Sequence, residues 1–234
     1  MRRALIGLVC AMGAAAGCTG DLDPPWQLDH DRIIAVRATP PGIAAGETAT
    51  LDALLGHKGA PTRVAAPELA AVVSPASLSD VVRLDGGNWV VTAPSEQRLA
   101  QVRTELALAA DAPVKLTVGV SYQSQALFAT KVIELGRSAV NPSLVSMNMQ
   151  IDGAPAGSVE IVVEPLVEVP LSIDADDENF DVTWLTSCGT MHDFDLPNAY
   201  LKVEPEDPTS GELAVVLRDA AAGVAWAVWP IRAE

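Results

Sequence analysis

Apolar and polar residues alternate in short runs along most of the chain, and this period of two predicts β-strands with one buried face. The first run, 33–39, places Ile34, Val36 and Ala38 on one face and ends at a Pro-Pro-Gly sequence. The second run follows Gly46, and its apolar residues share a face: Ala49, Leu51, Ala53 and Leu55. We therefore expect two half-buried strands at the start of the folded region.

One stretch has helical spacing instead. Ser95 can cap a helix, and Leu99, Val102 and Leu106 follow at intervals that place them on one helical face. The sequence thus predicts one helix over 96–108 in the mature protein.

Strands are predicted on both sides of this helix. The runs 81–84 and 89–92 flank Asp-Gly-Gly-Asn at 85–88, whose residues tolerate positive φ and favour a tight hairpin. The runs 114–122 and 127–135 come after the helix. The helix is therefore expected to cross over before the last two strands of a first sandwich.

The second half of the chain contains short apolar runs that recur about every ten residues, which is typical of a second β-sandwich. The predicted strands are 144–151, 159–163, 167–173, 180–186, 199–203, 212–218 and 224–231. Trp184 is expected in the core, on one face with Val182 and Thr186. Trp226 is expected on the inward face of the last strand.

Residues 137–143 contain Asn-Pro and form the best candidate for a linker. We expect one sandwich domain over 32–136 and another over 144–234. Strands and helices do not alternate in the sequence, so a parallel α/β enzyme fold is not expected. The predicted fold class is all-β, with two tandem sandwiches of which the first has one helical crossover.

The start of the folded region resembles bacterial immunoglobulin-like (Ig-like) domains. The shared features are Val36-x-Ala38-x-Pro40 and, after Gly46, the alternating sequence over 48–53. The resemblance implies that the sandwiches are Ig-like β-sandwich domains. It has no bearing on function, because one fold serves many functions.

The chain begins with the features of a secretory signal. Arg2 and Arg3 precede an apolar run at 4–16, which is shorter than the about 20 residues needed to span a bilayer. We therefore expect a signal helix within 1–17 and no transmembrane helix. Small residues directly before Cys18 resemble the lipobox of bacterial lipoproteins, which implies cleavage before Cys18 and a lipid, such as palmitate, on that residue. Ordinary secretion with a chance cysteine is the alternative.

The same resemblance bears on location. Thr19 stands where aspartate would retain an enteric lipoprotein in the inner membrane, so the family rule implies an anchor in the outer membrane of the cell envelope. The mature chain also resembles uncharacterised lipoproteins of myxobacterial type, through the Ig-like segment and the sequence Cys-Gly-Thr-Met-His-Asp at 188–193.

The charge of the chain narrows the class of partner. The formal net charge is −15, and loss of 1–17, which contain two arginines and no acids, makes it −17. Such a surface repels nucleic acid and anionic lipid headgroups, because both are bound mainly through Lys and Arg. We expect no nucleic-acid partner, and we expect membrane attachment to depend on the N-terminal lipid.

Residues 18–31 are acidic and contain Pro-Pro, which predicts a solvated, extended tether. Trp26 and Leu28 are the exceptions, and we expect them to dock on the first domain. His30 in this tether and His57 in a Gly-bounded loop are both expected to be solvated.

Three cysteines occur in the sequence, and two of them, Cys10 and Cys18, belong to the signal and the lipobox. The mature chain therefore has no intramolecular disulfide, and Cys188 is expected to be a small buried residue.

Two clusters of side chains are candidates for chemistry. The loop 174–181 contains six oxygen-bearing side chains: Asp174, Asp176, Asp177, Glu178, Asn179 and Asp181. Calcium prefers oxygen ligands, but the spacing is not that of an EF-hand, so a solvated acidic loop is the preferred interpretation.

The second cluster is Cys188, His192, Asp193 and Asp195. Its single Cys-x3-His pair falls short of the usual four zinc ligands, and nothing nearby supplies a second pair, so loop packing is preferred.

The sequence contains no nucleophile elbow, zinc-protease motif, phosphate loop or dinucleotide fingerprint. We expect no cofactor, no metal and no catalysis. The preferred hypothesis is a lipid-anchored envelope protein that acts as a structural or interaction module toward an unknown envelope protein or polymer. A calcium- or ligand-binding surface lipoprotein that uses the loop 174–181 is the alternative.

Overall fold

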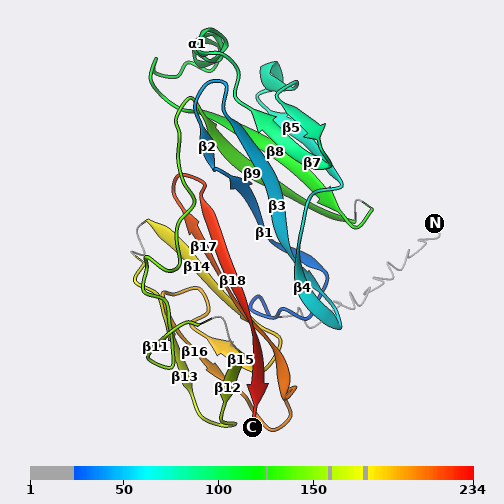
Figure 1. Cartoon of the computed structure of the whole chain (residues 1–234), viewed down its shortest axis with the longest axis vertical. Helices are drawn as coiled ribbons and strands as arrows, with labels where there is room; N and C mark the ends of the chain where they lie inside the picture. The colour runs from blue at the N-terminus through cyan, green and yellow to red at the C-terminus, as the bar shows by residue number, and fades with distance from the viewer. Residues whose placement is uncertain (1–23, 125, 158–159, 176–178) are drawn as a thin grey trace, which may run out of the picture.

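The computed structural model describes residues 24–124, 126–157, 160–175 and 179–234. The fold is all-β, with two tandem sandwiches that follow one another along the long axis of the molecule (Figure 1). The predicted fold class is confirmed. The predicted signal helix and the lipidation site at Cys18 lie outside the described residues.

The N-terminal sandwich has two sheets. In the first, the strand order is β1 (Arg32–Thr39), β3 (Thr48–His57), β7 (Asn88–Thr92) and β6 (Val82–Asp85), with β4 (Ala60–Ala65) also on β3. In the second, the order is β2 (Gly42–Ile43), β9 (Leu127–Leu135), β8 (Val114–Tyr122) and β5 (Leu69–Ser74). Because β2 pairs in parallel with β9, β1 and β2 are the two halves of a split first strand. This is the ABED and GFC order of the Ig fold.

The C-terminal sandwich repeats this order. One sheet is β11 (Ala154–Pro155), β10 (Gln150–Ile151), β13 (Val169–Ser172), β16 (Asn198–Lys202) and β15 (Thr190–His192). The other sheet is β12 (Ile161–Val163), β18 (Val224–Ala233), β17 (Ser210–Asp219) and β14 (Phe180–Thr186). Here β10 and β12 are the split first strand, since β12 pairs in parallel with the last strand, β18.

The predicted helix is present as α1 (Glu96–Glu105), between β7 in one sheet and β8 in the other. Its cap is Ser95, whose side chain accepts a hydrogen bond from the Arg98 amide, and Leu99 and Val102 are buried. It ends before the predicted 108, and Ala107 has a φ of 55°, which an α-helix does not allow. No helix in the described ranges is long and apolar enough to cross a membrane.

The core of the C-terminal sandwich surrounds Trp184 on β14, the third strand in Ig order. Its side chain is fully buried, and its indole Nε1 donates to the carbonyl of Leu196 at 3.0 Å. Val182 and Thr186 are buried too, as the predicted face requires. The expectation for Trp184 is confirmed.

A third apolar cluster lies between the two sandwiches. Its buried members are Leu28, Ala35, Leu54, Leu185, Ala214, Val216 and Val224. Apart from Leu28, which precedes β1, they come from β1 and β3 on one side and from β14, β17 and β18 on the other. The sheet that contains β17 is therefore covered by apolar contacts on both faces.

The predicted face of β1 is wrong in part, because a β-bulge lies between Ile33 and Ala35. Val36 is in the N-terminal core as expected, but Ile34 and Ala35 pack in the cluster between the sandwiches. The Ile34 carbonyl accepts a hydrogen bond from Arg218 on β17 at 2.9 Å. The extra residue of the bulge thus turns part of β1 toward the second sandwich.

The prediction for Trp226 is also wrong. Its ring is partly buried on the side of the N-terminal sandwich, with the Arg37 guanidinium 3.9 Å from the ring centroid. The inward position on β18 belongs to Trp229, which packs in the C-terminal core. Because both faces of this strand are covered, its alternation does not reveal which face belongs to its own core.

The segment that contains Trp26 and Leu28 docks mainly on the second sandwich, not on the first as expected. Trp26 packs against the C-terminal core, and Leu28 is buried between the sandwiches. Thr186, at the end of β14, donates its amide hydrogen to Trp26 and accepts one from Leu28, both at 2.9 Å. This segment therefore covers the β14 edge of its sheet.

Several short strands were not predicted, among them β2, β4, β5, β11 and β15. The segment 144–151 was predicted to be a strand, but it forms turns until β10 begins at Gln150. Short or exposed strands offer too few alternating positions to be recognised from periodicity.

Lys131 on β9 reaches the interface from the N-terminal sandwich, and its Nζ donates to the carbonyl of Ala222 in the β17–β18 turn. Burial lowers the pKa of Lys131 from 10.5 to about 8. The nearby carboxylate of Asp219 opposes this shift, and the guanidinium of Arg218 adds to it. A charged lysine is thus held in the interface at neutral pH at a cost in free energy.

Truncation of the core tryptophan should destabilise the protein strongly. We expect Trp184→Ala to lower the free energy of unfolding by about 3–5 kcal/mol, because it leaves a large cavity. Urea denaturation measures this, with Val167→Ala at an exposed position as the control. A loss below about 1 kcal/mol would contradict the burial of Trp184.

The buried lysine should make stability depend on pH. Between pH 8 and 10.5 the unfolded chain keeps the Lys131 proton and the folded chain loses it, so stability rises with pH in this window. A pKa change of one corresponds to about 1.4 kcal/mol, so the full effect is on the order of 3 kcal/mol. Urea denaturation from pH 7.5 to 10 measures this effect. The free energy of unfolding of the wild type should rise relative to that of Lys131→Met, because methionine does not titrate. A constant difference would show that the lysine stays charged.

Candidate functional site

The C-terminal sandwich leaves part of one strand edge unpaired. Strand β18 pairs with β17 along its whole length, from Ser210↔Arg232 to Arg218↔Val224. On its other side β12 covers only Ile231–Ala233. From Ala225 to Trp229, no other strand of the described residues pairs with this edge.

The register determines which backbone groups point out from the edge. On β17, Glu212 donates its amide hydrogen to Ser187 Oγ and accepts at its carbonyl from the Ser187 amide, so both groups face away from β18. Glu212 and its partner Pro230 are therefore a pair that exchanges no backbone hydrogen bonds, and the same holds for every second pair along β17 and β18. Val224 confirms the pattern, because its amide donates outward to Asn141 Oδ1 at 2.8 Å. The amides and carbonyls of Trp226 and Val228 point outward in the same way.

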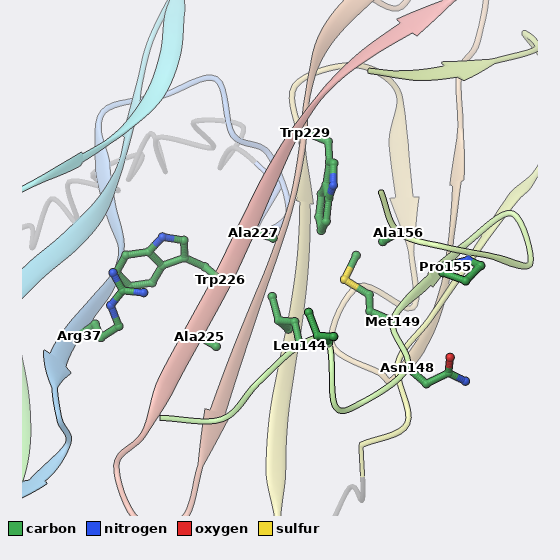
Figure 2. A pocket seen from close by; sticks show the side chains of 11 residues that line it. Arg37, Leu144, Asn148, Met149, Pro155, Ala156, Ala225, Trp226, Ala227 and Trp229 are labelled. Atoms are coloured by element: carbon green, nitrogen blue, oxygen red, sulfur yellow. The ribbon is translucent and has the colours of Figure 1, made fainter. Parts of the chain in front are cut away.

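A pocket of about 420 Å³ lies against this edge. On the side of the C-terminal core it is lined by Leu144, Met149, Ala156 and Trp229. Figure 2 shows Trp226 and Trp229 extending from opposite faces of β18, with Met149 and Leu144 near Trp229 and Arg37 beside Trp226. Apart from Trp229, its lining residues on the side of the C-terminal core lie shortly before β10 and directly after β11.

A second pocket, of about 710 Å³, continues along β18 to Pro230. Its other wall is β4 of the N-terminal sandwich, with Thr62, Arg63 and Val64. Both pockets share a set of lining residues: Ala156, Trp226, Ala227 and Trp229. We refer to the two pockets together, along 225–230, as the edge groove.

The polar groups of the edge groove are few, and most have partners. Arg37 donates from Nε and Nη2 to both carboxylate oxygens of Asp52, at 3.1 and 2.6 Å. The indole of Trp229 donates to the Gly157 carbonyl at 2.6 Å. The Glu212 carboxylate accepts the Thr62 amide hydrogen at 2.8 Å.

The described residues that line the edge groove include no histidine, cysteine, lysine or serine. The arrangement therefore suits binding of an apolar chain more than acid–base or nucleophilic chemistry.

The acidic loop lies partly outside the described residues, which leave out Asp176, Asp177 and Glu178. Asp174 accepts a hydrogen bond from Asn148 Nδ2 at 3.2 Å. Within the described part of the chain, no group of three or more His, Cys, Asp and Glu residues is placed to hold a metal ion. The structure thus adds no support for a calcium site, and the hypothesis stays untested.

The second predicted cluster is not brought together. Cys188 is buried, as expected, and its Sγ lies 2.9 Å from the Pro208 carbonyl. Burial raises the pKa of its thiol, which disfavours the reactive thiolate. His192 is exposed and stacks on Tyr200 with the ring centroids 4.3 Å apart.

His57, which was expected to be solvated, is about half exposed and bonds through Nδ1 to the Asp31 carboxylate. This bond and the amide of Lys58 lower the pKa of Asp31. Asp29 accepts the Gly59 amide hydrogen, so acidic residues of the predicted tether fix the β3–β4 hairpin.

Sequence reasoning did not find the edge groove. The available signals were Trp226 and Trp229, three residues apart on the last strand, and Pro230, since proline within a strand marks an edge position. The sequence does not show that the preceding segment, 144–156, leaves this edge open.

No family model matches the sequence, and no curated protein matches it. Among solved structures, the N-terminal Ig1-2 module of the Drosophila receptor protein tyrosine phosphatase DLAR is similar, with 10% identity over 87% of this chain and 98% of that chain and a TM-score of 0.29. The fibronectin(III)-like modules of Clostridium thermocellum CbhA have 11% identity over 86% of this chain and 94% of theirs, with a TM-score of 0.28.

A nucleoside hydrolase-related hypothetical protein from Saccharophagus degradans, associated with carbohydrate metabolism, has 10% identity over 41% of this chain and a TM-score of 0.31. The present chain matches 26% of the length of that protein. Scores this low support no inference about function. The Ig-like fold follows from the strand order of the two sandwiches.

Proposed function

We propose that this protein is a lipid-anchored module of the bacterial cell envelope that binds a partner in the edge groove and performs no catalysis. The observation that carries the proposal is the groove itself, which places two tryptophans and an unpaired strand edge at the junction of two sandwiches. Apolar grooves with a few placed polar groups are the usual form of binding sites.

The proposed lipid anchor is inferred from the sequence before Pro24. The apolar run at 4–16 and Cys18 support cleavage and lipidation, and a net charge of −17 for the mature chain leaves the lipid as the source of membrane affinity. Trp26 is the eighth residue after Cys18, and an extended chain spans at most about 3.6 Å per residue. Because Trp26 is docked, its docking point on the C-terminal sandwich would stay within about 30 Å of the lipidated Cys18.

The docking of Trp26 also fixes the place where the tether leaves the body. Thr186 lies at the end of β14, in the sheet that faces the N-terminal sandwich. The lipid would thus pull on the β14 edge, beside the junction between the sandwiches. This arrangement would present the whole body, with its groove, beside the membrane.

The anchor has a direct test. Cells that express the protein should incorporate labelled palmitate into it, and Cys18→Ser should abolish the labelling and release the protein from the membrane fraction. Cys188→Ser is the matched control, because this cysteine is buried and should not affect labelling. Labelling that persists in the Cys18 variant would disprove the lipobox.

The interaction role is tested by photo-crosslinking in intact cells. A benzophenone amino acid at Val145, which is exposed and lines the groove, should give a discrete covalent adduct. The same amino acid at Val167, exposed and outside the groove, is the control. Equal adducts at both positions, or none at Val145, would count against a partner in the groove.

A further inference from the structure

The two edges of the sheet β12-β18-β17-β14 differ in how far other segments cover them. Trp26–Leu28 cover the end of the β14 edge through backbone hydrogen bonds with Thr186. The β18 edge is left open over Ala225–Trp229, although unpaired edges invite association and folded proteins usually cover or blunt them. An open edge that lines a formed groove is therefore suited to a partner.

We propose that the edge groove binds an extended peptide segment of a partner protein, which adds to β18 as a strand. This inference names the partner class and rests on the proposed function. The segment has apolar side chains at alternate positions and an acidic side chain among the others.

The backbone of β18 determines that the ligand is a polypeptide in extended conformation. Trp226 and Val228 each present an amide donor and a carbonyl acceptor on the open side. An added strand satisfies both residues in a regular ladder, which is how peptides bind to exposed sheet edges elsewhere. The ladder is short, since five residues at about 3.3 Å each give a strand of about 17 Å.

The walls determine the side chains of the added strand. Successive side chains of a strand point to opposite faces. One set would enter the gap beside Leu144, Met149 and Trp229, which is apolar. The other set would face the N-terminal sandwich, where Arg37 and Arg63 line the groove.

Charge complementarity favours an acid in the second set. Arg37 is already neutralised by Asp52. The Glu212 carboxylate accepts the Thr62 amide hydrogen and keeps its negative charge, because the amide is neutral. Arg63 is exposed and has no ion pair among the described residues. At physiological salt the screening length is about 8 Å, so a carboxylate bound beside Arg63 is attracted by it and is largely screened from acids that lie farther away than this.

The test uses the purified full-length chain in detergent and a phage-displayed library of random nine-residue peptides. We expect enrichment of sequences that alternate apolar residues and contain an acid. A synthetic copy of an enriched peptide, with a fluorescent label, then gives the affinity by anisotropy. Failure to enrich any sequence above an unrelated protein would overturn the proposal.

The variant Val228→Pro removes an outward amide and leaves the ladder to β17 intact, as Pro230 already does two residues further along. We expect it to weaken peptide binding at least tenfold, and Val228→Thr, which keeps the amide, to bind as the wild type. The charge reversal Arg63→Glu should weaken acidic peptides and favour a lysine-substituted copy. Equal binding by Val228→Pro and Val228→Thr would overturn strand addition.

Amide hydrogen exchange on the wild type covers the case in which Val228→Pro does not fold. Peptide should slow the exchange of the Trp226 and Val228 amides, because they gain partners. The Ala225 and Ala227 amides already face β17 and should change little. Unchanged exchange at Trp226 and Val228 with bound peptide would contradict pairing.

A second copy of the chain is the other possible occupant. Sedimentation of the wild type would then show a dimer that Val228→Pro converts to a monomer, and this result would overturn the peptide proposal. All these measurements use purified protein, so a failed palmitate labelling does not affect them. A groove-specific adduct at Val145 without any peptide binding would leave the interaction role standing and refute strand addition.

Discussion

The structure depends on one constraint, which is that the sheet containing β17 must bury apolar side chains on both faces. On one face Leu213, Val215 and Leu217 pack in the C-terminal core. On the other face Ala214 and Val216 are fully buried against the N-terminal sandwich. The cluster between the sandwiches is therefore a shared core, in addition to the core that each sandwich has of its own. Separating the sandwiches would expose this apolar surface to water.

Polar contacts then fix the orientation that the shared core allows. The Asn141 side chain forms hydrogen bonds with both sandwiches. It donates to the Ala38 carbonyl on β1 at 2.9 Å and accepts from the Val224 amide on β18. Arg218 reaches the carbonyl that the β1 bulge exposes. The edge groove lies between these fixed walls, so its shape is a property of the junction and not of either sandwich alone.

The sequence was most informative where one face of an element is buried and the other is not. Ala49 to Leu55 and helix α1 were predicted correctly for this reason, because a clear period reports a single buried face. Trp184 was also predicted correctly, although both faces of β14 are buried, because sandwich cores often contain a tryptophan at this place. Trp226 and the face of Ile34 were predicted wrongly because both lie in the shared core, where neighbouring side chains are apolar whichever face they occupy. The groove escaped prediction for a related reason. It depends on where β12 stops pairing with β18, and that long-range register has no local signal. The boundary at 137–143 and the lipid on Cys18 stay predictions.

Pro230 has a consequence for how the open edge behaves among other protein molecules. An unguarded apolar edge can template sheet growth between molecules, which leads to aggregation. Here the open stretch is closed at one end by the side chain of Asn141 on Val224, and at the other by an imino nitrogen and the start of β12. The length of the open stretch would therefore limit which strands can pair with it. A short strand would fit in one register, and a longer strand from a misfolded neighbour would be blocked at both ends. Recognition and protection against fibre formation would then be two results of the same boundary.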